Sequence, residues 1–205
     1  MHIRSKLFLI GLGTAMIMAV GVGSASAGRI SISHGELTRL IWSSLKFQLA
    51  GITGAECPVT LEASYHSTTI SKTPNTLLGY VTRASISRCI TGNATILSET
   101  LPWHIQYGGF TETLPRPKLI QNLVGATFLI NNPLIGTCRS RTTATEPGVA
   151  IVEPTYETGG NGIAERVRVD ETKRIECVGI GRGNFAGEAR STESAGARNV
   201  LVRLI

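Results

Sequence analysis

Hydrophobic and polar residues alternate with a period of two along much of the chain. Between residues 59 and 65 the odd-numbered positions are apolar or aromatic, and the even-numbered positions are Thr, Glu and Ser. Three segments show the pattern best, with these side chains predicted to share a face: Val59, Leu61, Ala63 and Tyr65; Tyr80, Thr82, Ala84 and Ile86; Trp103, Ile105 and Tyr107. A period of two predicts strands that are half buried on one face.

Turn-forming residues separate the alternating segments. Gly, Pro and Asn gather at residues 73–75, 91–93, 108–109, 131–133 and 159–162. Many short strands with turns at nearly regular spacing are typical of layered or rolled antiparallel sheets. The sequence therefore predicts an all-β fold, an antiparallel β-sandwich or open barrel, in one domain from residue 28 to residue 205.

Residues 37–49 fit two patterns. As a helix, the segment stacks Leu37, Ile41, Leu45 and Gln48 along one side. As a strand, it places on one face Leu37, Ile41, Leu45, Phe47 and Leu49. We favour the strand, because Trp, Ile, Thr and Phe fit a pleated surface better than a helix.

The first 27 residues have the features of an export signal. Arg4 and Lys6 precede an apolar run from Leu7 to Val22, and Ala25-Ser26-Ala27 supplies the small residues that a signal peptidase reads. A charged start, an apolar middle and a small-residue end predict a signal peptide, residues 1–27, with cleavage before Gly28. The mature protein is expected to be secreted and extracellular, either free or associated with the cell wall.

The four cysteines, Cys57, Cys89, Cys138 and Cys177, form no CxxC pair. An even number of cysteines in an exported chain favours two disulfides over a metal site. Three connectivities are possible. We expect sequential pairing, Cys57 with Cys89 and Cys138 with Cys177, because each bridge would then staple one half of the chain.

The net charge is mildly positive. It is +6 for the whole sequence and falls to +4 without Arg4 and Lys6. This excess suits weak attraction to anionic cell-envelope polymers or membrane surfaces. Lys and Arg do not cluster among aromatic residues, so nucleic acid is not an expected partner.

A set of local strings carries a family resemblance: Cys57–Glu62, Leu78–Ala84, Leu101–Tyr107 and Val202–Ile205. Together they resemble a group of small, uncharacterised, exported β-rich proteins of actinobacteria. The resemblance spans most of the mature chain and implies a shared fold and export route. It implies no catalytic or binding residue. Pro58, within the first string, is expected to open a strand.

Catalytic and phosphate-binding motifs are incomplete in this sequence. Ser43–Lys46 fits Ser-x-x-Lys, but the Ser-Asp-Asn and Lys-Thr-Gly strings that accompany it in penicillin-interacting enzymes are missing. The glycine-rich run Gly179–Gly187 has the wrong register for a dinucleotide-binding loop. We therefore assign no catalytic residue and expect no cofactor.

His66, His104, Trp103 and Tyr107 are the candidate ligand contacts. Strict alternation places His66 on the same strand face as Glu62 and Ser64, and a polar outer face is the simpler interpretation. His66 and His104 would bind zinc with Glu62 only if they met across strands, which their spacing does not require, so no metal is expected. Trp103 and Tyr107 would form a stacking platform or part of the core, and we favour the core.

The leading functional hypothesis is a secreted or envelope-associated, non-catalytic module that binds by surface contact. Its partner would be an anionic cell-envelope polymer or another secreted protein. Two alternatives remain open. One is a secreted hydrolase whose site is assembled from loops around His66 or His104. The other is a carrier of a small ligand in a cavity lined by Trp103, Tyr107 and Phe128.

Overall fold

The structure is a computed structural model. It describes residues 30–32, 38–49, 51–66, 69, 72–111, 116–134, 136–156, 161–193 and 200–204. The predicted signal peptide and Leu37 lie outside the described residues.

The described chain consists of β-strands and one short 3-10 helix, η1. In chain order the elements are β1 (Ile30–Ile32), β2 (Thr38–Leu49), β3 (Ile52–Tyr65), β4 (Leu77–Ile86), β5 (Asn93–Ile96), η1 (Ser98–Thr100), β6 (Trp103–Thr111), β7 (Lys118–Val124), β8 (Thr127–Asn132), β9 (Gly136–Arg141), β10 (Gly148–Tyr156), β11 (Asn161–Val169), β12 (Ile175–Val178), β13 (Gly181–Ala186), β14 (Glu188–Glu193) and β15 (Val200–Leu204). The all-β prediction is confirmed. Within the described residues, no helix is long and apolar enough to cross a bilayer.

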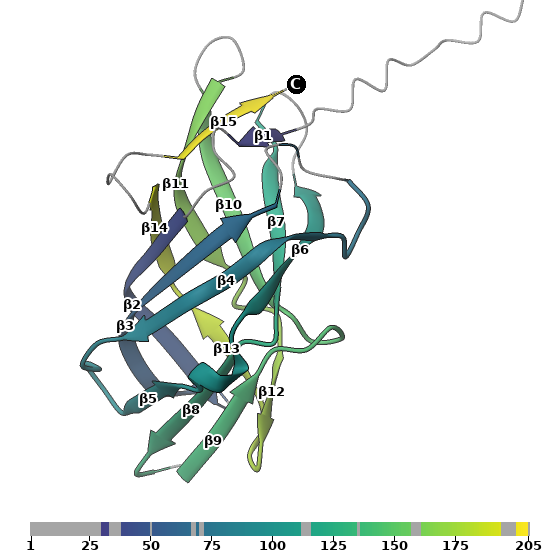
Figure 1. The fold of residues 1–205 in the computed structure, drawn as a ribbon. Helices are drawn as coiled ribbons and strands as arrows, with labels where there is room; N and C mark the ends of the chain where they lie inside the picture. Colours follow the sequence, from purple (N-terminus) through teal and green to yellow (C-terminus); the bar gives the residue numbers. More distant parts are fainter. Residues whose placement is uncertain are drawn as a thin grey trace, which may run out of the picture.

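Eight strands form a closed antiparallel barrel (Figure 1). Their order around the barrel is β11, β10, β7, β6, β4, β3, β2 and β14, and β14 closes the circle by pairing with β11. The prediction of an antiparallel sheet is confirmed. The prediction of a sandwich or an open barrel was wrong, because the sheet closes on itself. Closure depends on β14, which joins β2 to β11 although 111 residues of chain, 50–160, lie between those two strands.

Beyond the barrel, the sheet continues through the second half of β2 and the first half of β3, which pair with each other. The second half of β2 pairs with β13, and the sheet continues through β12, β9, β8 and β5. It then returns to β3 through an isolated bridge between Glu56 and Thr91, just before β5. We call β2, β3, β5, β8, β9, β12 and β13 the second ring. Figure 1 shows β5, β8, β9 and β12 below the barrel.

A bulge in β2 marks the passage from barrel to second ring. Ser43 and Ser44 together lie opposite the single residue Pro58, between the pairs Trp42 with Val59 and Leu45 with Cys57. The sequence predicts that Pro58 opens a strand, but the structure places it inside β3. A proline, which lacks an N–H donor, is tolerated at such a bulge.

The bulge also corrects the predicted face of β2. The strand itself is confirmed, and Leu45, Phe47 and Leu49 are buried as predicted. Ile41 is 40% exposed, so its predicted place on that face was wrong. With two outward residues in succession at the bulge, the inward positions change from even to odd numbers, and Leu40 is buried instead.

A second bulge moves Tyr80 to the outer face of β4. Arg83 pairs with Glu62 and Val81 pairs with Ala63, which leaves Thr82 as the extra residue. Val81 is buried, whereas Thr82 and Arg83 are both exposed. The predicted face therefore holds for Ala84 and Ile86, which pack against the core, but not for Tyr80.

Aromatic rings fill the junction between barrel and second ring. The rings of Phe47, Phe128 and Phe185, from β2, β8 and β13, are edge-to-face neighbours with centroids 5.1–5.5 Å apart. Trp103 of β6 packs on Phe128 from the barrel side at 5.3 Å. One hydrophobic core therefore runs through both parts.

The predicted disulfide pairing is confirmed, with bonds between Cys57 and Cys89 and between Cys138 and Cys177. Both bonds belong to the second ring. Cys57 lies on β3, and Cys89 lies two residues before Thr91 of the isolated bridge. The other two cysteines lie on β9 and β12. Each bridge closes a loop within one half of the chain, as predicted, but in space both lie in the same part of the fold. They stabilise the smaller part of the fold, where strands of four to six residues bury little surface.

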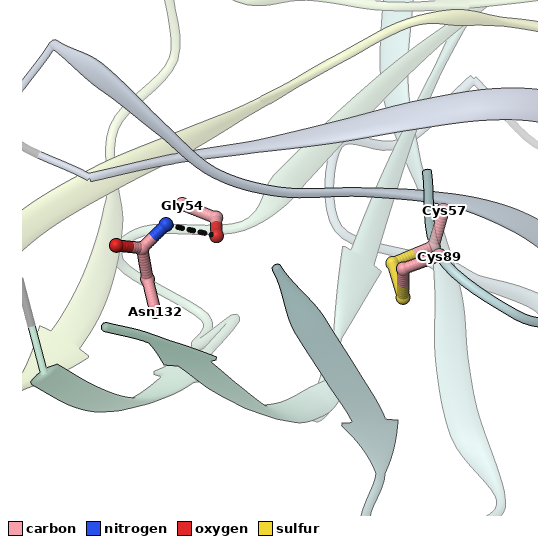
Figure 2. Close-up of a disulfide and its surroundings, with 4 residues drawn as sticks. All are labelled: Gly54, Cys57, Cys89 and Asn132. Atoms are coloured by element: carbon pink, nitrogen blue, oxygen red, sulfur yellow. Dashed lines mark hydrogen bonds between the residues drawn. A yellow bond between two sulfur atoms is a disulfide. The ribbon is translucent and has the colours of Figure 1, made fainter. Parts of the chain in front are cut away.

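A buried amide reinforces the same region (Figure 2). The side chain of Asn132, at the end of β8, donates a hydrogen bond of 2.8 Å from Nδ2 to the carbonyl oxygen of Gly54 in β3. Because the donor and acceptor come from strands that are not neighbours in the sheet, this bond helps to fix the end of the β8–β9 hairpin against β3.

Candidate functional site

An open groove of about 400 Å³ lies on the outer face of the barrel over β3 and β4. Its lining consists of Thr60, Glu62, Thr82, Arg83, Ala84, Ser85 and Leu101. The bulge in β4 turns Thr82 and Arg83 to the same side, and Leu101 approaches from the segment that follows η1. The lining is therefore rich in hydroxyl and charged groups, with one aliphatic wall.

The charges of the groove centre on Glu62. Its Oε1 accepts hydrogen bonds from Nε and Nη2 of Arg39 at 3.2 and 2.8 Å. Its Oε2 lies 3.6 Å from Nη1 of Arg83, whose side chain is 80% exposed. One carboxylate thus stands between two guanidinium groups, and the local charge is positive. Arg83 keeps most of its donors available to solvent or a ligand.

A row of three rings continues the outer face beyond the groove. His66 follows β3, Tyr80 lies on β4 and His104 lies on β6. The Tyr80 ring is edge-to-face with both neighbours, with centroids 4.8 Å from His66 and 5.2 Å from His104. Ser64 pairs with Tyr80 in the sheet, so the row begins directly beside the groove.

The structure places the predicted histidines on exposed surface. They do not meet, because Tyr80 stands between them. Glu62 and Ser64 share the outer face with His66 as expected, but the Glu62 carboxylate is engaged by Arg39 and Arg83. Within the described part of the chain, neither imidazole has a hydrogen-bonding partner, and no three His, Cys, Asp or Glu side chains are grouped to hold a metal ion.

The other two candidates, Trp103 and Tyr107, point into the core and are buried. The indole Nε1 of Trp103 donates to Oγ1 of Thr100 at 2.8 Å, so its polar atom is satisfied within the protein. The Tyr107 ring packs against Phe110 at 5.5 Å. Both side chains stabilise the fold and present little surface to a ligand.

Two small cavities lie in the interior formed by the described residues. A cavity of about 20 Å³ lies near Tyr65 and Gln121, where Nε2 of Gln121 donates to the tyrosine oxygen at 2.9 Å. Burial raises the pKa of Tyr65, so its hydroxyl remains protonated at neutral pH. A second, apolar cavity of about 50 Å³ is lined by Trp42, Phe128 and Phe185, among others. Sites for drug-sized ligands are several times larger, on the order of 300–1,000 Å³.

Sequence reasoning did not predict the groove, and it missed the charged and aromatic residues beside it, Arg39, Arg83 and Tyr80. The first two flank Glu62 only because β2, β3 and β4 are adjacent and in this register. A search for opposite charges at facing positions of neighbouring strands would have found them once the strand order was known.

No protein-family model, no curated protein and no solved structure matches this chain. The resemblance to exported actinobacterial proteins therefore stays a prediction.

Proposed function

We propose that the protein is an exported, non-catalytic binding module that holds a segment of an anionic cell-envelope polymer in the β3–β4 groove. The observation that carries the proposal is the exposed guanidinium of Arg83 beside the already paired carboxylate of Glu62. Because Arg39 neutralises Glu62, the free donors of Arg83 add a net positive charge to the groove.

The shape of the groove suits a chain ligand. It is open, and the His66–Tyr80–His104 row lies beside it on the same outer face. Thr60, Thr82 and Ser85 supply hydroxyl groups that both donate and accept hydrogen bonds. In a polysaccharide with acidic substituents, the acidic groups would bind the arginine and the sugar hydroxyls would hydrogen-bond with the protein hydroxyls. The apolar sugar faces would stack on the exposed rings.

The surroundings of the histidines favour binding over hydrolysis. A triad needs a base within hydrogen-bond reach of a nucleophile and an acid that orients the base. His66 and His104 are exposed, and their ring neighbour is Tyr80. The nearest candidate acid on the strand, Glu62, already binds two arginines.

The small size of the two interior cavities among the described residues disfavours a carrier. The discriminating feature for a carrier would be an apolar pocket lined by Trp103, Tyr107 and Phe128. Of these, only Phe128 lines the apolar cavity of about 50 Å³. The two disulfides agree with an oxidising location outside the cytoplasm, as expected for an envelope-associated module.

Replacing Arg83 by alanine is expected to weaken co-sedimentation of the oxidised protein with purified peptidoglycan sacculi by about tenfold, the usual effect of losing one charge-assisted contact. The measurement is the protein concentration that gives half-maximal binding, at low and at physiological ionic strength. Because the contact is ionic, the difference in half-maximal binding between the unaltered protein and Arg83→Ala should shrink as salt is added.

Arg190→Ala is the matched control, since Arg190 is also an exposed outer-face arginine but lies on β14, three strands around the barrel. It should bind like the unaltered protein. Equal losses for both variants would reduce the interaction to general charge attraction and contradict a groove. Soluble products released from sacculi, with release abolished by His66→Ala, would identify a hydrolase instead.

A further inference from the structure

The far end of the second ring carries exposed aliphatic side chains. Four of them protrude there or on its flank: Ile52, 51% exposed, Ile90, 65%, Leu134, 88%, and Val178, 50%. Single exposed aliphatic residues are ordinary, but several at one end of a molecule indicate a contact surface.

Strand pairing brings these residues to one end. Leu134 is in the turn between β8 and β9, and Val178 ends β12 opposite Arg139 of β9. Ile52 begins β3, two residues from Gly54, which accepts the hydrogen bond from Asn132 (Figure 2). The tips of the β8–β9 and β12–β13 hairpins extend together at the bottom of Figure 1. Ile90 lies on the flank, where its N–H donates to the carbonyl of Glu56 at 2.7 Å.

Tight turns and crosslinks hold the four side chains in place. Gly51, Gly136 and Gly179 have positive φ angles, which only glycine adopts without strain, and they make the turns short and protruding. Ile90 is adjacent to Cys89 and Val178 is adjacent to Cys177, so each is one residue from a disulfide. A contact made by such fixed side chains loses little conformational entropy.

The charge of this end is positive. The segments 50–54, 87–93, 131–137 and 178–183 contain no Asp or Glu. The nearest acid is Glu56, whose carboxylate accepts a hydrogen bond from the Ser44 hydroxyl. Two further acids, Glu176 and Glu146, are paired with Arg141 and Arg182. Within the described residues, Arg88 and Arg139 have no ion-pair partner, and both are exposed.

We propose that this end of the second ring docks on an anionic lipid bilayer. Aliphatic tips among unpaired arginines match the two layers of such a surface, because the arginines contact phosphate headgroups while the aliphatic side chains enter the acyl boundary. A protein partner is a poorer match, since the aliphatic groups stand on separate turns and form no continuous flat patch. This proposal rests on residues outside the groove and does not depend on the function assigned to it.

The test is flotation of the oxidised protein starting at Gly28 with phosphatidylcholine vesicles, with and without phosphatidylglycerol. The unaltered protein should float with the phosphatidylglycerol vesicles, and less so as salt increases. Leu134→Asp should weaken binding about tenfold or more, because an aspartate cannot enter the acyl boundary and repels the headgroups. Arg139→Gln should weaken it several-fold.

Ile41→Asp and Arg190→Gln are the matched controls, since both residues are exposed on the barrel wall. Each should bind vesicles like the unaltered protein and remain folded under the conditions of the assay, although Ile41→Asp loses about 1 kcal/mol of strand propensity. Failure of the unaltered protein to bind phosphatidylglycerol vesicles at low salt, equal binding to pure phosphatidylcholine, or equal losses in Leu134→Asp and Ile41→Asp would overturn the proposal. Arg83→Ala should leave vesicle binding unchanged, so this outcome is separable from that of the sacculus experiment.

Discussion

The Phe47→Ala variant is expected to lose about 3–5 kcal/mol of unfolding free energy. Phe47 is completely buried and is edge-to-face with both Phe128 and Phe185. Its truncation would leave a cavity between strands of the barrel and strands of the second ring, where the surrounding backbone is held by pairing on both sides and has little freedom to collapse. Urea denaturation followed by tryptophan fluorescence measures the change.

Ile41→Ala is the control on the same strand. Ile41 lies on the outer face before the bulge, so the substitution should cost no more than about 1 kcal/mol, the span of strand propensity. Similar losses for the two variants would mean that β2 carries no bulge at Ser43 and Ser44 and that its inward face is the one first predicted from the sequence.

The double substitution Cys138→Ala and Cys177→Ala is expected to lower the unfolding free energy by about 3–4 kcal/mol. The two cysteines are 39 residues apart, and in the chain-entropy model a loop of this length restricts the unfolded chain by about that amount. Both side chains are also buried, so their truncation adds a smaller packing loss. Denaturation of the oxidised protein and of the variant gives the difference.

The Cys57→Ala and Cys89→Ala pair provides the comparison, with a loop of 32 residues and a similar expected loss. Free thiols found by mass mapping of the protein isolated without reductant would contradict the premise of both experiments. So would an unfolding midpoint that does not change when the unaltered protein is reduced.

The alternation of side chains predicted the strands well, because a half-buried strand imposes its period directly on the sequence. It predicted faces less well. Ser43, Ser44 and Thr82 each belong to a bulge that adds one outward residue, and every position beyond the bulge then changes face. This is why Ile41 and Tyr80 were assigned to the wrong side. The proline at position 58 was the one local sign of the first bulge.

No pattern in the sequence indicated closure of the barrel in the way that alternation indicated the strands. β14, with the sequence Glu188–Glu193, is short and largely polar, and it joins two strands that are remote in the chain. The candidate site depends on the same long-range order. His66 and His104 were found from residue type alone, whereas Arg39 and Arg83 acquire meaning only from their register with Glu62.

Because β2 and β3 belong to both rings, two continuous strands connect the barrel to the second ring. β3 runs without interruption from Ile52, at the proposed membrane contact, to Thr60, at the groove. The eight steps from the first of these residues to the last span at most roughly 27 Å. In the proposed orientation this strand would act as a rigid spacer that holds a captured polymer at a constant height above the lipid headgroups, and its length could change only if both rings unfolded together.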